Sequence, residues 1–143
     1  MSTTNTQLGK FSLDNGRFVT VTVFNGQTYV HIRQFKTEGV NVYPTKSGIS
    51  LLPARFARLS SIADDIDTQI KRLSTAEEFS YKRHIGGGVF CEVKSGMYCV
   101  NIRRHFVTEG NSNPIPTKVG ISLRLTEWSK FKDLIGEIKK TIH

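Results

Sequence analysis

The chain has 143 residues, of which 38% are hydrophobic and 22% are charged, a composition typical of a globular protein rather than a disordered one. Its formal net charge of +8 favours a polyanionic partner, either a nucleic acid or an anionic membrane surface. No apolar run reaches the roughly 18 residues that a membrane-spanning helix requires. The N-terminus lacks the apolar core of a signal peptide, so we expect a soluble intracellular protein.

The first part of the chain predicts a small sheet. Residues 18–24 alternate Val with polar Thr, which indicates a half-buried strand. Asn25-Gly26 is typical of a two-residue hairpin turn, and residues 29–35 form the expected return strand. A loop then leads to a short segment that ends at Lys46, and residues 48–51 form a short fourth strand.

A helix is expected to follow this sheet. Pro53 suits the first position of a helix over residues 53–73, and apolar side chains recur in it at helical spacing. The same spacing predicts a second helix over residues 126–142. The short polar link over residues 74–78 marks the expected boundary between two units.

One eight-residue segment occurs twice, which indicates an internal duplication. Residues 44–51 read Pro-Thr-Lys-Ser-Gly-Ile-Ser-Leu, and residues 116–123 differ only where Val119 replaces Ser47. We therefore expect an α+β fold with two modules, residues 1–73 and 74–143. Each is a four-stranded antiparallel sheet followed by one helix. A unit of about 60 residues buries little surface alone, so we expect the copies to pair as an intramolecular pseudo-dimer, or between chains in a dimer of tandems.

The excess positive charge lies in the predicted sheets. Each helix region, 53–73 and 125–143, has four basic and three acidic residues, so most of the net charge falls on the strands. This distribution favours an anion-binding sheet over a basic, membrane-binding helix. Alternation places Tyr29, His31, Arg33 and Phe35 on one face of a strand, a mixture that suits stacked bases and phosphates. A solvated face with incidental aromatic residues is the alternative.

The second copy has the corresponding row Cys99, Asn101 and Arg103, followed by Phe106. Strict alternation would put Phe106 on the opposite face from Arg103. The second copy has one more residue than the first between the arginine and the aromatic residue. We therefore expect a β-bulge within residues 98–106 that returns Phe106 to the face of Arg103.

The motifs Ile-Arg-x-Phe at residues 32–35, Lys-x-Gly-Ile-Ser-Leu at 46–51 and the early aromatic residue of the helix resemble a known domain. It is the C-terminal single-stranded-DNA-binding domain of the positive cofactor four family of transcriptional coactivators. Residues 102–106 and 118–123 and Trp128 carry the same resemblance in the second copy. It implies a curved four-stranded sheet with one helix, paired domains, and binding of single-stranded DNA or melted duplex with little sequence preference.

The resemblance implies contacts by an arginine, an aromatic residue and a lysine in each copy, and by residues of the hairpin. Together with the basic and aromatic residues of the strands, this gives one set of candidates for nucleic-acid binding: Arg17, Phe24, Tyr29, His31, Arg33, Phe35, Lys46, Lys94, Arg103, Phe106 and Lys118.

The sequence therefore predicts a single-stranded nucleic-acid-binding protein of low sequence specificity in transcription or DNA metabolism. RNA as the ligand and the transcription machinery as a further partner are compatible with it. The alternative is an interaction module for acidic partners such as activation domains. The sequence contains no recognisable catalytic motif, and its Cys and His follow no metal-ligand spacing, so we expect no enzyme, cofactor or metal. We expect the protein in the nucleus if it is eukaryotic, and a viral or bacterial origin is equally open.

Overall fold

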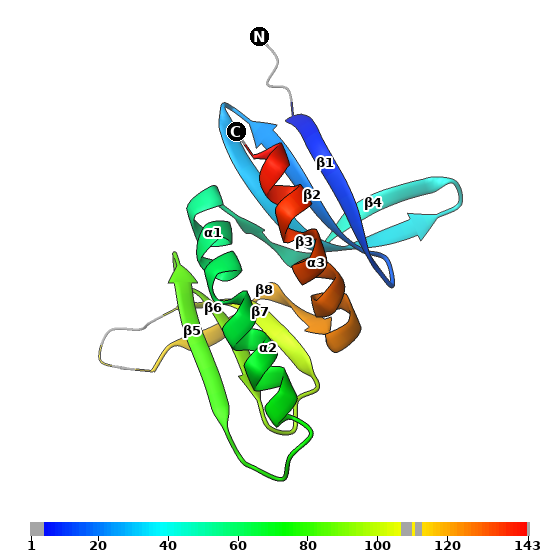
Figure 1. The fold of residues 1–143 in the computed structure, drawn as a ribbon. Helices are drawn as coiled ribbons and strands as arrows, with labels where there is room; N and C mark the ends of the chain where they lie inside the picture. Colours follow the sequence, from blue (N-terminus) through cyan, green and yellow to red (C-terminus); the bar gives the residue numbers. More distant parts are fainter. Residues whose placement is uncertain (1–4, 107–109, 111–112, 143) are drawn as a thin grey trace.

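The computed structural model describes residues 5–106, 110 and 113–142 of the chain (Figure 1). Eight strands and three helices follow one another along these residues. In chain order they are β1 (Asn5–Asp14), β2 (Arg17–Phe24), β3 (Gln27–Glu38), β4 (Asn41–Leu51), α1 (Pro53–Ser61), α2 (Ala63–Arg72), β5 (Ser80–Gly86), β6 (Val89–Lys94), β7 (Cys99–Phe106), β8 (Ile115–Arg124) and α3 (Leu125–Thr141).

All eight strands belong to one sheet, in the order β1-β2-β3-β4-β8-β7-β6-β5, and all neighbouring strands are antiparallel. We call β1 to α2 the first half and β5 to α3 the second half. The halves of the sheet meet at a single pairing, between Gly48 of β4 and Gly120 of β8. This arrangement confirms the α+β fold and the pairing of two strand-and-helix units within one chain.

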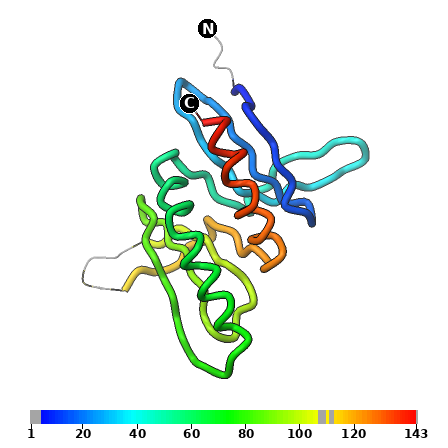
Figure 2. Tube along the Cα trace, in the orientation of Figure 1, coloured from blue at the N-terminus to red at the C-terminus, as the bar shows by residue number. Residues whose placement is uncertain are grey.

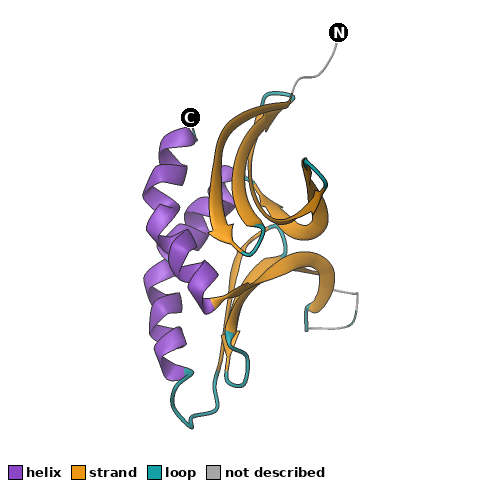
Figure 3. Cartoon of the chain, turned by 90° about the vertical axis from the view of Figure 1, so that its right-hand side faces the viewer, coloured by secondary structure: helices purple, strands orange, loops and turns teal. Residues whose placement is uncertain are grey.

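The helices form one layer, and both halves of the sheet curve away from it (Figure 3). Each half also covers part of the other. The second-half helix α3 packs on β1 and β2 as well as on β7 and β8, whereas α1 packs on β5 and α2 on β6. Figure 2 shows α3, in orange and red, beside the blue strands of the first half. No helix in the described ranges is long and apolar enough to cross a bilayer.

A single hydrophobic core lies between the helix layer and the sheet. It is built by the alternating apolar positions of the strands, such as Val19 and Val21, and by the apolar stripes of the helices. Phe56 of α1 and Phe131 of α3 meet edge to face across the middle of this core, with ring centroids 6.1 Å apart. Trp128 is 1% exposed beside them, which makes it a core residue.

The predicted elements are largely present, with two differences among the strands. The first strand, β1, was not expected, because most of its side chains are exposed and a register shift after Gln7 interrupts its alternation. The segment ending at Lys46 and the short strand after it are one long strand, β4. The two-residue hairpin is confirmed, since Asn25 and Gly26 both have positive φ and join β2 to β3.

The first helix is also not continuous. Ile62, with φ −102° and ψ 5°, separates α1 from α2. Its side chain stays in the core, because the helical spacing of apolar residues continues across the break. The helix of the second half is uninterrupted.

Close approach of the strands explains why glycine occupies the centre of both repeated segments. A Cβ added to Gly48 would lie 2.6 Å from the carbonyl oxygen of Ile32 and 2.7 Å from the Cα of Arg33. A Cβ on Gly120 would meet the backbone of Ile102 and Arg103 at 2.7 Å. Both obstacles are backbone atoms that cannot rotate away, so no larger residue fits without moving a strand.

We expect Gly48→Ala to lower the free energy of unfolding by about 1–3 kcal/mol, because the added methyl group would collide with the backbone of Ile32 and Arg33 in β3. Urea denaturation followed by circular dichroism measures this change. Gly136→Ala is the matched control, since Gly136 lies in α3 with no atom near its missing Cβ. There the same substitution should stabilise the helix by about 0.5–1 kcal/mol. Equal effects at the two positions would contradict the steric explanation.

Candidate nucleic-acid interface

The face of the sheet opposite the helices carries the candidate site, and we call it the concave face. Each half holds its arginine there in the same way. Arg33 donates from Nη1 to the carbonyl of Thr45 (2.9 Å), and Arg103 donates from Nη1 to the carbonyl of Thr117 (3.0 Å). Each arginine therefore has a fixed position while part of its guanidinium group stays accessible.

A bulge in β4 and β8 creates this carbonyl acceptor. Arg33 pairs with Gly48, but Phe35 pairs with Pro44, so the three residues between Pro44 and Gly48 leave the ladder. The same register shift occurs in the second half between Arg103 and His105. The exposed candidates Lys46 and Lys118 lie in these bulges, next to the threonine that holds each arginine.

The hydrogen bonds of the bulge account for the repeated sequence. Thr45 Oγ1 donates to the carbonyl of Gln34 (2.8 Å) and accepts from the backbone N–H of Ser47 (3.2 Å). Thr117 makes the same two bonds, to the carbonyl of Arg104 and from the N–H of Val119. The one position that differs between the copies thus contributes only its backbone to this pattern, which explains why both Ser and Val are tolerated.

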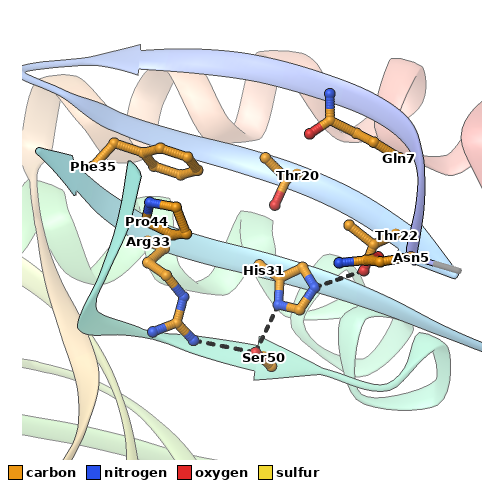
Figure 4. A pocket seen from close by; sticks show the side chains of 9 residues that line it. All are labelled: Asn5, Gln7, Thr20, Thr22, His31, Arg33, Phe35, Pro44 and Ser50. Atoms are coloured by element: carbon orange, nitrogen blue, oxygen red, sulfur yellow. Dashed lines mark hydrogen bonds between the residues drawn. The ribbon is translucent and has the colours of Figure 1, made fainter. Parts of the chain in front are cut away.

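A polar network runs across the concave face of the first half (Figure 4). His31 is hydrogen-bonded through Nε2 to Thr22 Oγ1 (2.8 Å) and through Nδ1 to Ser50 Oγ (2.7 Å). Arg33 Nη2 donates to the same Ser50 hydroxyl (3.2 Å). Burial, and to a lesser degree the charge of Arg33, lower the pKa of His31, so the imidazole is neutral near pH 7.

Two adjoining grooves open above this network. One has a volume of about 310 Å³ and extends from His31 and Arg33 to Phe35 and Pro44. The other, of about 290 Å³, is bordered by Phe24 and Tyr29 on the far side of His31. The rings of Tyr29 and His31 are close to parallel, at 26°, with centroids 6.0 Å apart. The structure therefore brings these five candidates of the first half together on one surface.

In both halves a lysine lies over an aromatic ring that meets a second ring edge to face. Phe18 and Phe35 meet edge to face at 5.1 Å, and the Lys10 ammonium lies 4.6 Å and 4.8 Å from their ring centroids. In the second half Phe90 meets His105 edge to face at 4.9 Å, and the Lys82 ammonium lies 5.0 Å from the Phe90 centroid.

Sequence reasoning missed Lys10, Phe18, Lys82 and Phe90. The alternation of residues 18–24 was the available signal, because it places Phe18 on the same face as the candidate Phe24. Lys10 could not be found in this way, since its strand was not predicted.

The prediction for Phe106 is wrong. The bulge lies in β8 and not in β7, and the first half has the same bulge, so it does not shift Phe106 relative to Arg103. His105 occupies the place of Phe35, because its N–H donates to the carbonyl of Gly88 as that of Phe35 does to Gly16. Phe106 is 47% exposed and alternates away from Arg103. The extra residues of the second copy lie between His105 and Pro116, partly outside the described residues.

Strand register identifies the first-half counterpart of the candidate Lys94. Phe18 pairs with Arg33 in the first half, and Phe90 pairs with Arg103 in the second, so Phe18 and Phe90 are equivalent. The residues that follow them along β2 and β6 are equivalent in the same order. Lys94 therefore matches Thr22 and not the hairpin residue Phe24. By the same count Glu92 matches Thr20, which lines the larger groove of the first half.

Arg17 is not part of the concave face. Alternation in β2 puts it beside Val19 on the helix side, where Nη1 pairs with Glu127 Oε1 at 3.0 Å. The Glu127 side chain of α3 is fully buried and also accepts from Asn15 Nδ2 (2.8 Å) and the N–H of Arg124 (2.7 Å). Arg17 thus neutralises a buried carboxylate of the other half, which makes its role structural.

The chemistry of the concave face is that of binding. Its cations are anchored but partly accessible, and its rings and hydroxyl groups line open grooves. Among the described residues no three His, Cys, Asp or Glu side chains gather in a way that could hold a metal ion. Such a surface can accept phosphates through its cations and stack planar groups on its rings.

Comparison with known proteins gives an independent finding. A sequence model of the family described as Transcriptional Coactivator p15 (PC4) matches residues 11–62 and 92–134, one segment in each half. A Caenorhabditis elegans protein named "Putative RNA polymerase II transcriptional coactivator" is 36% identical over 59 residues. The matched region is 40% of this chain and 48% of that relative, so it spans about half of the relative's length. No solved structure matches the chain significantly.

We expect Arg17→Met to lower the free energy of unfolding by about 3–5 kcal/mol, because Glu127 would remain buried without its cation. Urea denaturation measures the loss, and adding Glu127→Gln should recover part of it. Lys130→Met is the control. It breaks an exposed pair with Asp14 (2.9 Å), which should contribute at most about 1 kcal/mol. If the two methionine variants were equally destabilised, the buried pair would not join the halves as described.

We also expect the protein to lose stability as the pH falls below about 6.5, the ordinary pKa of histidine. The folded state lowers the pKa of His31, so in this range the unfolded chain binds a proton that the native site resists. His31→Asn places there the residue that the second half has at Asn101, and it should reduce the loss. Unfolding free energies at pH 7.5, 6.5 and 5.5 test this. Identical pH profiles for the two proteins would show that His31 is not responsible.

Proposed function

This chain belongs to the Transcriptional Coactivator p15 (PC4) family, and from that membership and the geometry of its concave face we propose that it binds single-stranded nucleic acid, mainly DNA, with little sequence preference. The observation that carries the proposal is the cluster present in both halves. Each contains an arginine that is hydrogen-bonded to a threonine carbonyl, a lysine in the adjacent bulge, and an aromatic ring under a second lysine. Cations that hold phosphates next to exposed rings are the usual means of binding single strands.

The shape of the surface favours a single strand over an intact duplex. Proteins that read duplex DNA place a helix or a two-stranded ribbon in a groove. Here the helices are packed on one side of the sheet, which curves away from them (Figure 3). Cationic groups such as Arg33 and Arg103 lie on the opposite, concave face. Melted duplex would offer the same ligand, and RNA is a further candidate because none of the contacts we identify requires a deoxyribose.

The cellular role follows from the family. We propose that the protein acts as a non-enzymatic coactivator in transcription, with the transcription machinery as a second partner, and in the nucleus if its source is eukaryotic. We place the boundary of its two modules between residues 73 and 74, in the link between α2 and β5. The shared core favours a monomeric pseudo-dimer over a dimer of tandems.

Fluorescence titration of a labelled oligothymidylate at several salt concentrations tests the binding. The logarithm of affinity should fall against the logarithm of salt concentration with a slope of about −0.7 per phosphate contact. Arg33→Ala combined with Arg103→Ala should weaken binding and make the slope shallower by about 1.4, if each arginine holds one phosphate. The control, Lys139→Ala with Lys140→Ala, removes the same charge from exposed positions of α3 and should change affinity little.

Two outcomes would contradict the proposal. Equal affinity for the single strand and for a duplex of the same sequence would show that the concave surface does not select single strands. Equal losses in the arginine and lysine double variants would mean that net charge alone drives binding. If an acidic peptide instead bound more tightly than the oligonucleotide, and Phe35→Ala left its affinity unchanged, the surface would be a site for acidic protein segments.

A further inference from the structure

We infer that the two halves divide the recognition of a bound strand. The first half holds an unstacked nucleobase in its groove, and the second half contacts phosphates only. This inference rests on the single-strand binding proposed above and adds which part of the ligand each half takes. The family motif is present in both halves, so the difference comes from residues outside the motif.

The first half offers what a nucleobase requires. Both grooves described above belong to it. His31 lines both of them, and Tyr29, whose ring is nearly parallel to that of His31, lines the second. Phe24, 42% exposed, adds a third ring at the open end. Hydroxyl and amide groups of Thr22, Ser50 and Asn5 line the same space and can bond to the edge of a base.

The second half replaces these groups at the equivalent positions. Cys99 takes the place of Tyr29 and Asn101 takes the place of His31, so two rings are lost. Glu92 takes the place of Thr20 and puts a carboxylate on the concave face. Within the described residues Glu92 has no ion pair, and at this position it would repel a phosphate and offer a base no stacking surface.

Electrostatic attraction does not favour the first half. By strand register its concave face carries three cations, whereas that of the second half carries five cations and the Glu92 carboxylate. The cations are Lys10, Arg33 and Lys46 in the first half, and Lys82, Lys94, Arg103, Lys118 and Arg124 in the second. Both halves therefore attract a phosphate backbone. The second half keeps Phe90, which contacts His84 and His105, but the Lys82 ammonium lies over that ring and there are no rings at the positions of Tyr29 and His31.

Oligothymidylate and an abasic oligonucleotide of the same length separate the two contributions. Both have the same phosphates, but only the first has bases to stack. We expect the unaltered protein to prefer oligothymidylate by about 5- to 150-fold, the range for one stacked base. Tyr29→Ala should remove most of this preference and leave the salt slope unchanged. Tyr98→Ala is the matched control, since Tyr98 is an exposed aromatic residue of the second half, outside both grooves.

The second half is tested by Lys94→Thr, which introduces the residue that the first half has at Thr22. It should make the salt slope shallower by about 0.7 and leave the preference for oligothymidylate unchanged. Unfolding free energies show whether each variant is folded. His31→Asn, which copies Asn101, is a second test of the groove, and it too should lower the preference.

Each result leads to a definite conclusion. If the unaltered protein bound neither oligonucleotide, the proposed function itself would be wrong. If it bound both equally, single-strand binding would stand but the nucleobase groove would be ruled out. If Tyr29→Ala and Tyr98→Ala lowered the preference equally, both halves would stack bases and the division of recognition would be overturned.

Discussion

The burial of apolar surface under shared helices is the constraint on which the rest of the structure depends. Neither half covers its own sheet fully, because α3 extends over β1 and β2 while α1 and α2 cover β5 and β6. The ion pair between Arg17 and Glu127 also holds the halves together, because the buried Glu127 carboxylate of one half requires the Arg17 cation of the other. The halves cannot separate without exposing the core, so the two concave faces keep a constant spacing.

Local patterns were sufficient to predict much of this fold. Alternating valines located β2, the Asn-Gly pair located the turn after it, and the repeated segment revealed the duplication. The repeated residues also lie together on the concave face, because they are tied to one another by short-range bonds. Thr45, Arg33 and Gly48 form one such set, and it is reproduced in the second half.

What could not be predicted depends on where insertions and long-range contacts fall. An unequal spacing between repeats does not reveal whether the extra residue lies in a bulge or in a loop, and so Phe106 was matched to Phe35 in place of His105. Arg17 was assigned to the ligand because a sequence does not show that a carboxylate 110 residues away is buried against it. Both errors concern tertiary geometry rather than residue chemistry.

The link between α2 and β5 has a consequence for how the protein responds to dilution. A pair of separate subunits falls apart when the protein concentration drops below its dissociation constant, and its site disappears with it. Here the partner surface is always present on the same chain, at a high effective concentration. The complete concave surface therefore stays assembled at protein concentrations at which a surface shared by two separate subunits would be lost.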